Sequence, residues 1–333
     1  MEKRAQRGIT SKGALFHYAV TKLLQGADRN GSSALFLAVS SQLGRNDDLE
    51  IGQIRRRERE GIMGSLRIVI KGAGEMATGI ACRLFMANLT NIVMLETPRP
   101  LAIRRTVSFS EVVYEGEAEV EGIKAVLMKD LEDLPRLWKR EQIGVIVDPE
   151  WKTIVALKPD AVIDAIMAKR NLGTRIKEAP LVVGVGPGFN APEDVHEVVE
   201  SNGGHNLGRA ICKGAAEPHT RIPAIVMDFG VDRVLRPPHA GRIRHVRHPR
   251  ETVLKGDIVL CVDETPVATK IDGLLRDLIR EMDVKENEKL ADVDPRGVME
   301  YYCTVTDKAR AIGGGALETV MKRYNPMVGN CES

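Results

Sequence analysis

Short apolar runs alternate with helical patterns between residues 66 and 185. The runs cover 66–70, 92–95, 143–147, 161–165 and 181–185. The helical patterns between them extend to about Leu89 after the first run and cover 131–142 and 151–157 further on. Continuous, β-branched runs of this length are typical of strands buried on both faces of a parallel sheet. The alternation predicts an α/β fold with a Rossmann-like parallel sheet.

The pattern changes to short strands and turns from about Ala224. The strand-like segments are 241–247, 255–263 and 266–273. Spacings of about ten residues between strands indicate a small β barrel or sandwich. We therefore predict a Rossmann-like nucleotide-binding domain over 63–222 and a smaller, β-rich barrel or sandwich lobe with a C-terminal helix over 223–333.

The first 62 residues show no hydrophobic period long enough to define a fold, although short helices over 15–24 and 34–43 fit the pattern. This segment also carries the basic excess of the chain, including the arginine-rich run 55–60. A solvated tail is favoured over an anion-binding surface for that run. We interpret 1–62 as an extension that is either disordered or lies ahead of the native start at Met63.

Composition argues against several classes of protein. The net charge of +2 at pH 7 and the aromatic content of 4% supply neither the charge nor the stacking platforms typical of nucleic-acid binding. The five cysteines form no Cys-x-x-Cys pair, so neither a disulfide framework nor a thiolate zinc site is expected. No apolar run is long enough to span a bilayer. We predict a cytoplasmic protein without nucleic-acid or membrane partners.

The strongest local signal is a Gly-x-Gly-x-x-Ala motif between the first strand and the first helix. Gly72 allows the tight turn, Gly74 leaves space for a pyrophosphate at the backbone, and Ala77 lets the helix pack close to the strand. The free N–H groups and the positive end of the helix favour a bound anion. Thr78 follows directly and joins this predicted dinucleotide-binding set.

Three charged residues extend the predicted binding site. Glu96 ends the second strand, 24 residues after Gly72, where an acidic side chain accepts hydrogen bonds from a ribose diol. Arg104 and Arg105 follow and could hold an additional phosphate, as in NADP, or another anionic group. A solvated helix face is the alternative interpretation of the two arginines.

Other candidate residues follow later strands. Because ligands bind at the carboxyl ends of parallel strands, we expect Asp164 and the second glycine-rich turn, 184–188, to share one rim with the first loop. This turn is expected to open a helix over 192–200. Asp164, Lys169 and His205 are the candidates for proton transfer, with the catalytic residues otherwise unknown. The spacing of the histidines matches no metal signature, so no metal site is predicted.

Two further segments are candidate anion sites. Between residues 233 and 250 lie six arginines and three histidines without an acidic residue, which indicates either a phosphate-binding patch or a charged, solvated edge strand. Residues 307–318 are expected to form a glycine-rich loop that opens a helix. Their glycines could instead serve close packing onto the first lobe.

Several collinear blocks resemble one family. They are KGAGEMATGIACRLF, ETPRPLAIRRTVSFSEVVYEGE, DAIMAKRNLGT, VGVGPGFNAPEDVHEVVE, GGHNLGR and DKARAIGGGALE. Over residues 66 to 325 the chain resembles the accessory proteins of selenium-dependent molybdenum hydroxylases (YqeB-like), and its first loop is similar to that of XdhC-type maturation proteins. The resemblance implies a role in maturing or supporting such hydroxylases, with the hydroxylase or its cofactor as partner.

The leading expectation is an accessory protein that binds a dinucleotide-like ligand, either a molybdopterin dinucleotide or NAD(P). The alternatives are an NAD(P)-dependent oxidoreductase and a scaffold whose β-rich lobe docks a hydroxylase. The sequence leaves open whether the chain catalyses a reaction and whether it forms a homo-oligomer.

Overall fold

The computed structural model describes residues 65–220, 223 and 225–325. The chain divides into two compact units, 1–60 and 61–333, and all described residues lie in the second. The extension 1–62, its two short helices, its arginine-rich run and the start at Met63 therefore lie outside the described residues. Within the described part of the chain, no helix combines the length and apolarity needed to cross a bilayer.

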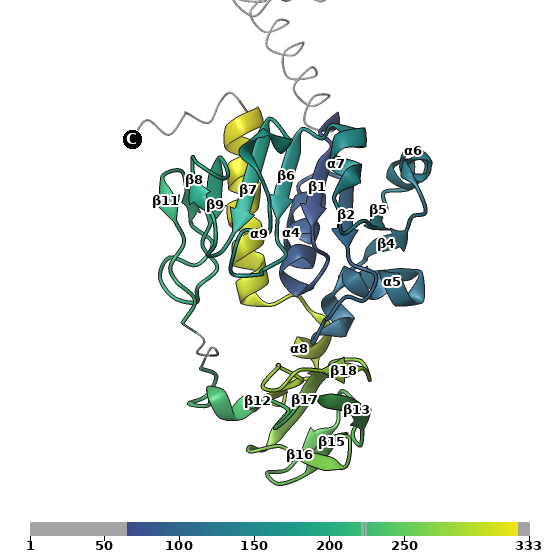
Figure 1. Cartoon of the computed structure of the whole chain (residues 1–333), viewed down its shortest axis with the longest axis vertical. Helices are drawn as coiled ribbons and strands as arrows, with labels where there is room; N and C mark the ends of the chain where they lie inside the picture. Colours follow the sequence, from purple (N-terminus) through teal and green to yellow (C-terminus); the bar gives the residue numbers. More distant parts are fainter. Residues whose placement is uncertain (1–64, 221–222, 224, 326–333) are drawn as a thin grey trace, which may run out of the picture. The chain divides into compact units, whose positions relative to one another are not determined.

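A nine-stranded sheet forms the first lobe (Figure 1). Its order is β10 (Ala210–Ile211), β9 (Glu197–Val199), β7 (Leu181–Val185), β6 (Ala161–Asp164), β1 (Ile68–Lys71), β2 (Ile92–Glu96), β5 (Ile143–Val147), β4 (Ile123–Leu127) and β3 (Glu117–Val120). The interior pairs are parallel, and only β3 and β10 pair antiparallel with their neighbours. A mixed α/β fold with a large, mainly parallel sheet is thus confirmed.

The strand order places a change of direction beside β1. From β1 the chain first adds β2 and β5 on one side, and it then returns to add β6 and β7 on the other. Every residue of β1, β6 and β7 is buried, as expected for strands covered on both faces. Ligands of open parallel sheets bind at the carboxyl ends of strands that flank such a reversal. The candidate site therefore lies where β1 and β6 end.

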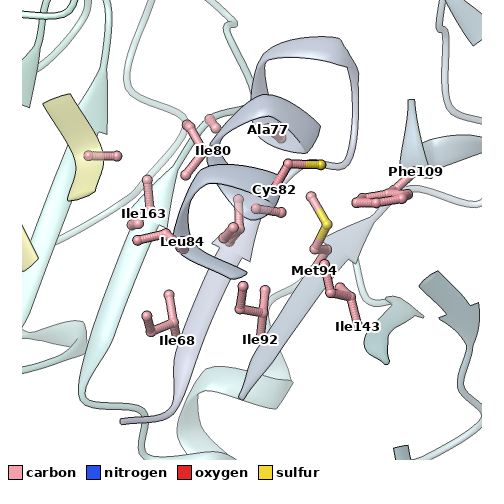
Figure 2. Close-up of a cluster of buried hydrophobic side chains, with 14 of the residues drawn as sticks. Ile68, Ala77, Ile80, Cys82, Leu84, Ile92, Met94, Phe109, Ile143 and Ile163 are labelled. Carbon is pink, nitrogen blue, oxygen red and sulfur yellow. The ribbon is translucent and has the colours of Figure 1, made fainter. Parts of the chain in front are cut away.

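Two helices pack together over one face of this sheet, although they are distant in sequence. These are α4 (Glu75–Met86) and α9 (Asp307–Tyr324). Their buried apolar residues, including Ile80 and Ile312, join the same core as Ile68 and Ile163 from the strands. Figure 2 shows the α4 side chains of this core above the strands. The opposite face carries α6 (Leu134–Lys139) and α7 (Lys152–Leu157).

The glycines of the last helix correct one sequence prediction. Residues 307–318 form no loop, because α9 is continuous and its glycines lie in the helix interior. A Cβ on Gly313 would lie 2.8 Å from the carbonyl oxygen of Gly79 on α4, and one on Gly315 would lie 2.1 Å from that of Gly208. Glycine is required here for close packing, so the packing alternative is confirmed and the anion-binding loop is wrong.

The predicted helix over 192–200 is also wrong. This segment instead contains a turn after β8 (Asn190–Ala191) and then β9, which pairs parallel with β7. Val198 and Val199 are buried in the sheet. Pairing and burial of these β-branched residues outweigh the helix-start signals that precede them.

The second lobe contains two four-stranded antiparallel sheets that share one buried core. One is β12 (Val234–Leu235), β19 (Ala291–Asp294), β17 (Gly273–Leu278) and β14 (Thr252–Val253), and the other is β16 (Thr265–Ala268), β15 (Ile258–Val262), β13 (Gly241–His245) and β18 (Asp283–Val284). The short helix α8 (Glu300–Cys303) then leads into α9. Further short elements include α5 (Val112–Glu115) and β11 (Gly214–Ala215), and β11 pairs with β8.

Candidate functional site

The glycine loop, residues 72–77, joins β1 to α4. Gly72 has φ +88°, and a Cβ there would lie 3.2 Å from the Cα of Ile166, so this position requires glycine. Gly74 is the N-cap of α4, and no side chain caps the helix. A Cβ on Gly74 would meet nothing within 4 Å. The loop therefore leaves open space at the start of a 12-residue helix, which suits an approaching anion.

The remaining residues of the predicted loop set support the loop from behind. Ala77 and Thr78 are fully buried. The hydroxyl of Thr78 donates to the carbonyl oxygen of Ala73 at 3.1 Å and accepts from the backbone N–H of Phe109 at 2.9 Å. Thr78 thus fixes the conformation of the loop. Glu96 accepts from the backbone N–H of Ala73 at 2.8 Å and from that of Thr97 at 2.7 Å.

The two predicted phosphate-binding arginines are engaged within the chain. Arg104 is 4% exposed; it binds Glu75 Oε1 at 2.7 Å and donates to the carbonyl oxygens of Tyr301 and Thr304 at 2.8 and 3.0 Å. Arg105 binds Glu111 at 2.9 Å. Arg104 therefore connects the first turn of α4 to the segment around α8.

Asp164 lies in a closed cluster of polar side chains. It stands beside Lys71 in the β1–β6 register, and its carboxylate accepts from the Thr174 hydroxyl at 2.6 Å. Lys71 Nζ donates to the same hydroxyl at 2.7 Å, lies 2.7 Å from Glu178 Oε2 and sits 3.5 Å from the centre of the Trp151 ring. Burial lowers the pKa of Lys71 and raises the pKa of Asp164. We call these five residues the Lys71 cluster; sequence reasoning missed Lys71.

The other two proton-transfer candidates are exposed. Lys169 follows β6 with φ +62°, and His205 lies in a turn before β10. Within the described residues no hydrogen bond links His205 to Asp164 or to Lys169. The structure therefore does not bring the three candidates together as one catalytic group.

The loops that follow β1, β6 and β7 meet at one edge, as expected for parallel strands. A Cβ on Gly188 would lie 2.5 Å from Arg170 Cα, and one on Gly186 would lie 2.4 Å from Ser201 Oγ. Gly72 likewise approaches Ile166. The loops that follow the three strands therefore form one continuous rim. The 165–174 loop fills the space behind the glycine loop, so the open side is the one at Gly74.

A cavity of about 750 Å³ lies beside the first turn of α4. It is lined by this turn, by the segment from α8 to the start of α9, and by residues of the β-rich lobe. Its buried cations are Arg104, Arg233 and Arg276, which are 4%, 6% and 8% exposed. We call this space the arginine cavity. Sequence reasoning missed Arg276, because it belongs to a segment far from the glycine loop along the chain, whereas Lys308 lies in the candidate anion segment 307–318.

The cations of the arginine cavity differ in how completely they are neutralised. Arg233 is paired with Asp292 at 2.9 Å. Arg276 has weaker partners: its Nε donates to the carbonyl oxygen of Tyr301 at 3.3 Å, and Asp294 lies 3.8 Å away. Asp294 is itself bound to Arg296 at 2.6 Å. Burial, followed by repulsion from Arg104, lowers the pKa of Arg276.

Lys308 is the second incompletely neutralised cation. It is half-buried at the start of α9, and its ammonium group forms no ion pair within the described part of the chain. Burial lowers the pKa of Lys308, while Glu75 and Glu200 oppose this change and Lys169 and Lys289 add to it. Burial, rather than neighbouring cations, is therefore the main cause of the lowered pKa of Lys308.

The basic segment 233–250 does not form one anion site. Arg233 is buried in the arginine cavity, whereas Arg236 donates to the carbonyl oxygen of Asn287. Arg247 pairs with Glu251 and Asp257. Most of this charge is thus dispersed over the β-rich lobe. Among the residues that the structure describes, no group of three histidine, cysteine or acidic side chains is placed to hold a metal ion.

Known proteins provide one informative similarity. The chain is 40% identical over 280 residues to "Uncharacterized protein YqeB" of Escherichia coli K12; the match covers 82% of this chain and 52% of that protein. The chain thus spans about half the length of this relative. No protein-family model matches this chain.

Two solved structures give weaker similarities. One is the ectoine utilization protein EutE (DoeB) from Ruegeria pomeroyi, at 13% identity and a TM-score of 0.20, covering 64% of this chain and 61% of that one. The other is an aspartoacylase family protein from Mesorhizobium loti, at 12% identity and 0.22, covering 68% and 84%. The informative comparison is the sequence similarity to YqeB.

Proposed function

We propose that this chain is an accessory protein of selenium-dependent molybdenum hydroxylases that binds a dinucleotide-like ligand at the glycine loop. The observation that supports ligand binding is the open space at Gly74, at the uncapped start of α4. A pyrophosphate in this space would accept hydrogen bonds from the first backbone N–H groups of the helix.

The surrounding fold favours a dinucleotide over a simple anion. The strand order β7-β6-β1-β2-β5 supports this proposal, because in Rossmann-like sheets of such an order the pyrophosphate lies at the helix after β1 and the ribose near the end of β2. Glu96 ends β2 and already accepts two backbone N–H groups. A carboxylate offers about four acceptor positions, so Glu96 retains capacity for a ribose hydroxyl. The candidate ligands are a molybdopterin dinucleotide and NAD(P).

The hydroxylase connection rests on the sequence blocks that resemble the accessory family, which lie between residues 71 and 318. The similarity to YqeB is compatible with it, but the chain covers only about half of that protein. A cytoplasmic location and a molybdenum hydroxylase as partner belong to the same proposal. The oxidoreductase alternative gains no support from Asp164, because this carboxylate is 2% exposed and covered by Thr174.

Ligand binding is tested by titrating the full-length protein with NAD(H), NADP(H) and molybdopterin dinucleotide in a calorimeter. We expect one of them to bind and Gly74→Val to weaken its binding by at least about tenfold, since a branched side chain would fill the pyrophosphate space. Gly314→Ala is the matched control, because a Cβ there also meets nothing within 4 Å but lies on α9. Absence of binding by all three, or equal binding by the Gly74→Val variant, would refute the proposal.

The partner is tested separately with purified components. A selenium-dependent molybdenum hydroxylase should elute with the full-length protein in size-exclusion chromatography. Separate elution of the two proteins, with and without the bound dinucleotide, would contradict the accessory role while leaving ligand binding intact.

A further inference from the structure

The cations that line the arginine cavity are unevenly paired with carboxylates. Six cations line it, namely Arg104, Arg233, Arg276, Arg296, Lys308 and Arg310, against four carboxylates. Two of the six have partners outside the lining set, since Arg296 binds Asp294 and Arg310 binds Glu121. Arg276 and Lys308 are left with the weakest neutralisation. A buried cation is costly unless it is paired, so an anion in this space would be stabilised.

The buried arginines also retain hydrogen-bond donors. The Nε atoms of Arg104 and Arg233 are buried and have no hydrogen-bond partner in the structure. Both side chains line the cavity and are more than nine-tenths buried. Unsatisfied donors are uncommon in protein interiors and call for a specific explanation. These two Nε atoms are closed off from the cavity, so contacts to an anion there fall to Arg276 and Lys308.

The positive ends of two helices also favour an anion in the arginine cavity. Glu75 and Met76, from the first turn of α4, line the cavity together with Asp307 and Lys308 of α9. Both helices are long enough to present positive N-terminal ends, with 12 and 18 residues. The start of α9 has its own cap, because the Thr306 hydroxyl accepts from the N–H of Ala309. The start of α4 has no side-chain cap, so its positive end adds to the attraction of an anion in the neighbouring cavity.

We propose that the arginine cavity binds a phosphate or pyrophosphate group, with Arg276 and Lys308 as its ionic contacts. Guanidinium and ammonium groups bind phosphate oxygens through charge-assisted hydrogen bonds. A volume of about 750 Å³ lies within the usual range for small-molecule sites, so the group can be free or part of a larger molecule. The inference does not depend on a dinucleotide at the glycine loop.

The test is calorimetric titration of the full-length protein with inorganic pyrophosphate at constant ionic strength. We expect one binding site, and Lys308→Gln and Arg276→Met should each weaken binding by at least about tenfold, as removal of one charge-assisted contact does. Lys308 is half-buried and makes no ion pair with a described residue, so Lys308→Gln should fold even if Arg276→Met does not. Arg247→Gln is the control with the same loss of charge on the β-rich lobe, and it should bind as tightly as the parent protein.

The outcomes separate this inference from the proposed function. No heat of binding with pyrophosphate, or equal affinity for the parent and the Lys308→Gln variant, overturns the inference. Pyrophosphate binding that is lost in Lys308→Gln supports it even if no dinucleotide binds. Titration with ADP identifies the source of the group: tighter binding than pyrophosphate points to a nucleotide ligand, and weaker binding points to the free anion.

Discussion

Lys71 and Arg276 are both buried cations, but their surroundings differ. Lys71 is fully buried and is met by the Thr174 hydroxyl, the Glu178 carboxylate and the Trp151 ring, each within 3.5 Å. Arg276 borders a cavity, and its nearest carboxylate is 3.8 Å away. A closed cluster stabilises one conformation of the chain, whereas an incompletely paired cation beside a cavity can bind an anionic ligand. Perturbed pKa values occur at both, so the pKa alone does not separate the two cases.

The largest effect should follow from breaking the closed cluster. Lys71→Met leaves Glu178 and Asp164 without their buried cation, and we expect the free energy of unfolding to fall by about 3–5 kcal/mol. Urea denaturation followed by circular dichroism measures it. Lys124→Met is the matched control, because Lys124 pairs with Glu117 near the surface and should lose less than about 1 kcal/mol. Similar losses for both variants would show that the Lys71 cluster is not closed.

A second, smaller effect concerns pH. Burial lowers the folded-state pKa of Lys71 below its usual 10.5. Stability from the neutral amine is therefore present above pH 10.5 and lost as the pH falls through the lowered folded pKa. The difference in unfolding free energy between the parent protein and Lys71→Met should grow as the pH rises toward 10.5. A constant difference across this range, measured by urea denaturation, would show that Lys71 keeps its usual pKa.

Loss of the cation that borders the cavity should cost less stability. Arg276→Met removes a poorly paired buried charge, while Asp294 keeps its bond to Arg296. We expect the free energy of unfolding to fall by less than about 1 kcal/mol, or to rise, because replacing such a charge with an apolar side chain is often neutral. Thermal unfolding provides the measurement. A loss as large as that of Lys71→Met would assign Arg276 to a structural network.

The smallest effect is on chemical reactivity rather than stability. Lys308 is half-buried beside the cavity and Lys71 is inaccessible. Acetic anhydride should therefore acetylate Lys308 at pH 8 and leave Lys71 unmodified, and pyrophosphate should slow the reaction at Lys308. Mass spectrometry of the digested protein reads both sites, with the exposed Lys152 as a reference that pyrophosphate leaves unchanged. Acetylation of both Lys71 and Lys308 at one rate would remove the distinction.

Much of the first lobe was predictable because its strands are short, continuous and apolar. The predicted ranges 143–147 and 181–185 match β5 and β7 residue for residue. The glycine loop was equally predictable, since Gly72 needs its positive φ and Gly74 its open side. Local sequence determines these features.

The failures have a common cause in long-range packing. In the sequence, the glycines of α9 indicate a loop. In the structure, they allow the helix to approach α4 and Gly208 closely. The intramolecular partners of Arg104, which are Glu75 and the carbonyl oxygens near α8, lie outside its local sequence. The partners of Lys71 and Arg276 likewise come from distant segments, so no local pattern identifies either cluster.

The position of α9 in the sequence affects how the protein folds during synthesis. The ribosome makes the sheet strands and then the whole β-rich segment before residues 307–324 emerge. Until then, the surface of α4 around Gly79 and Ile80 lacks the helix that later covers it. The nascent chain thus carries an unfinished apolar surface of the kind that promotes association with other chains or with chaperones. Completion of the first lobe is coupled to completion of the second.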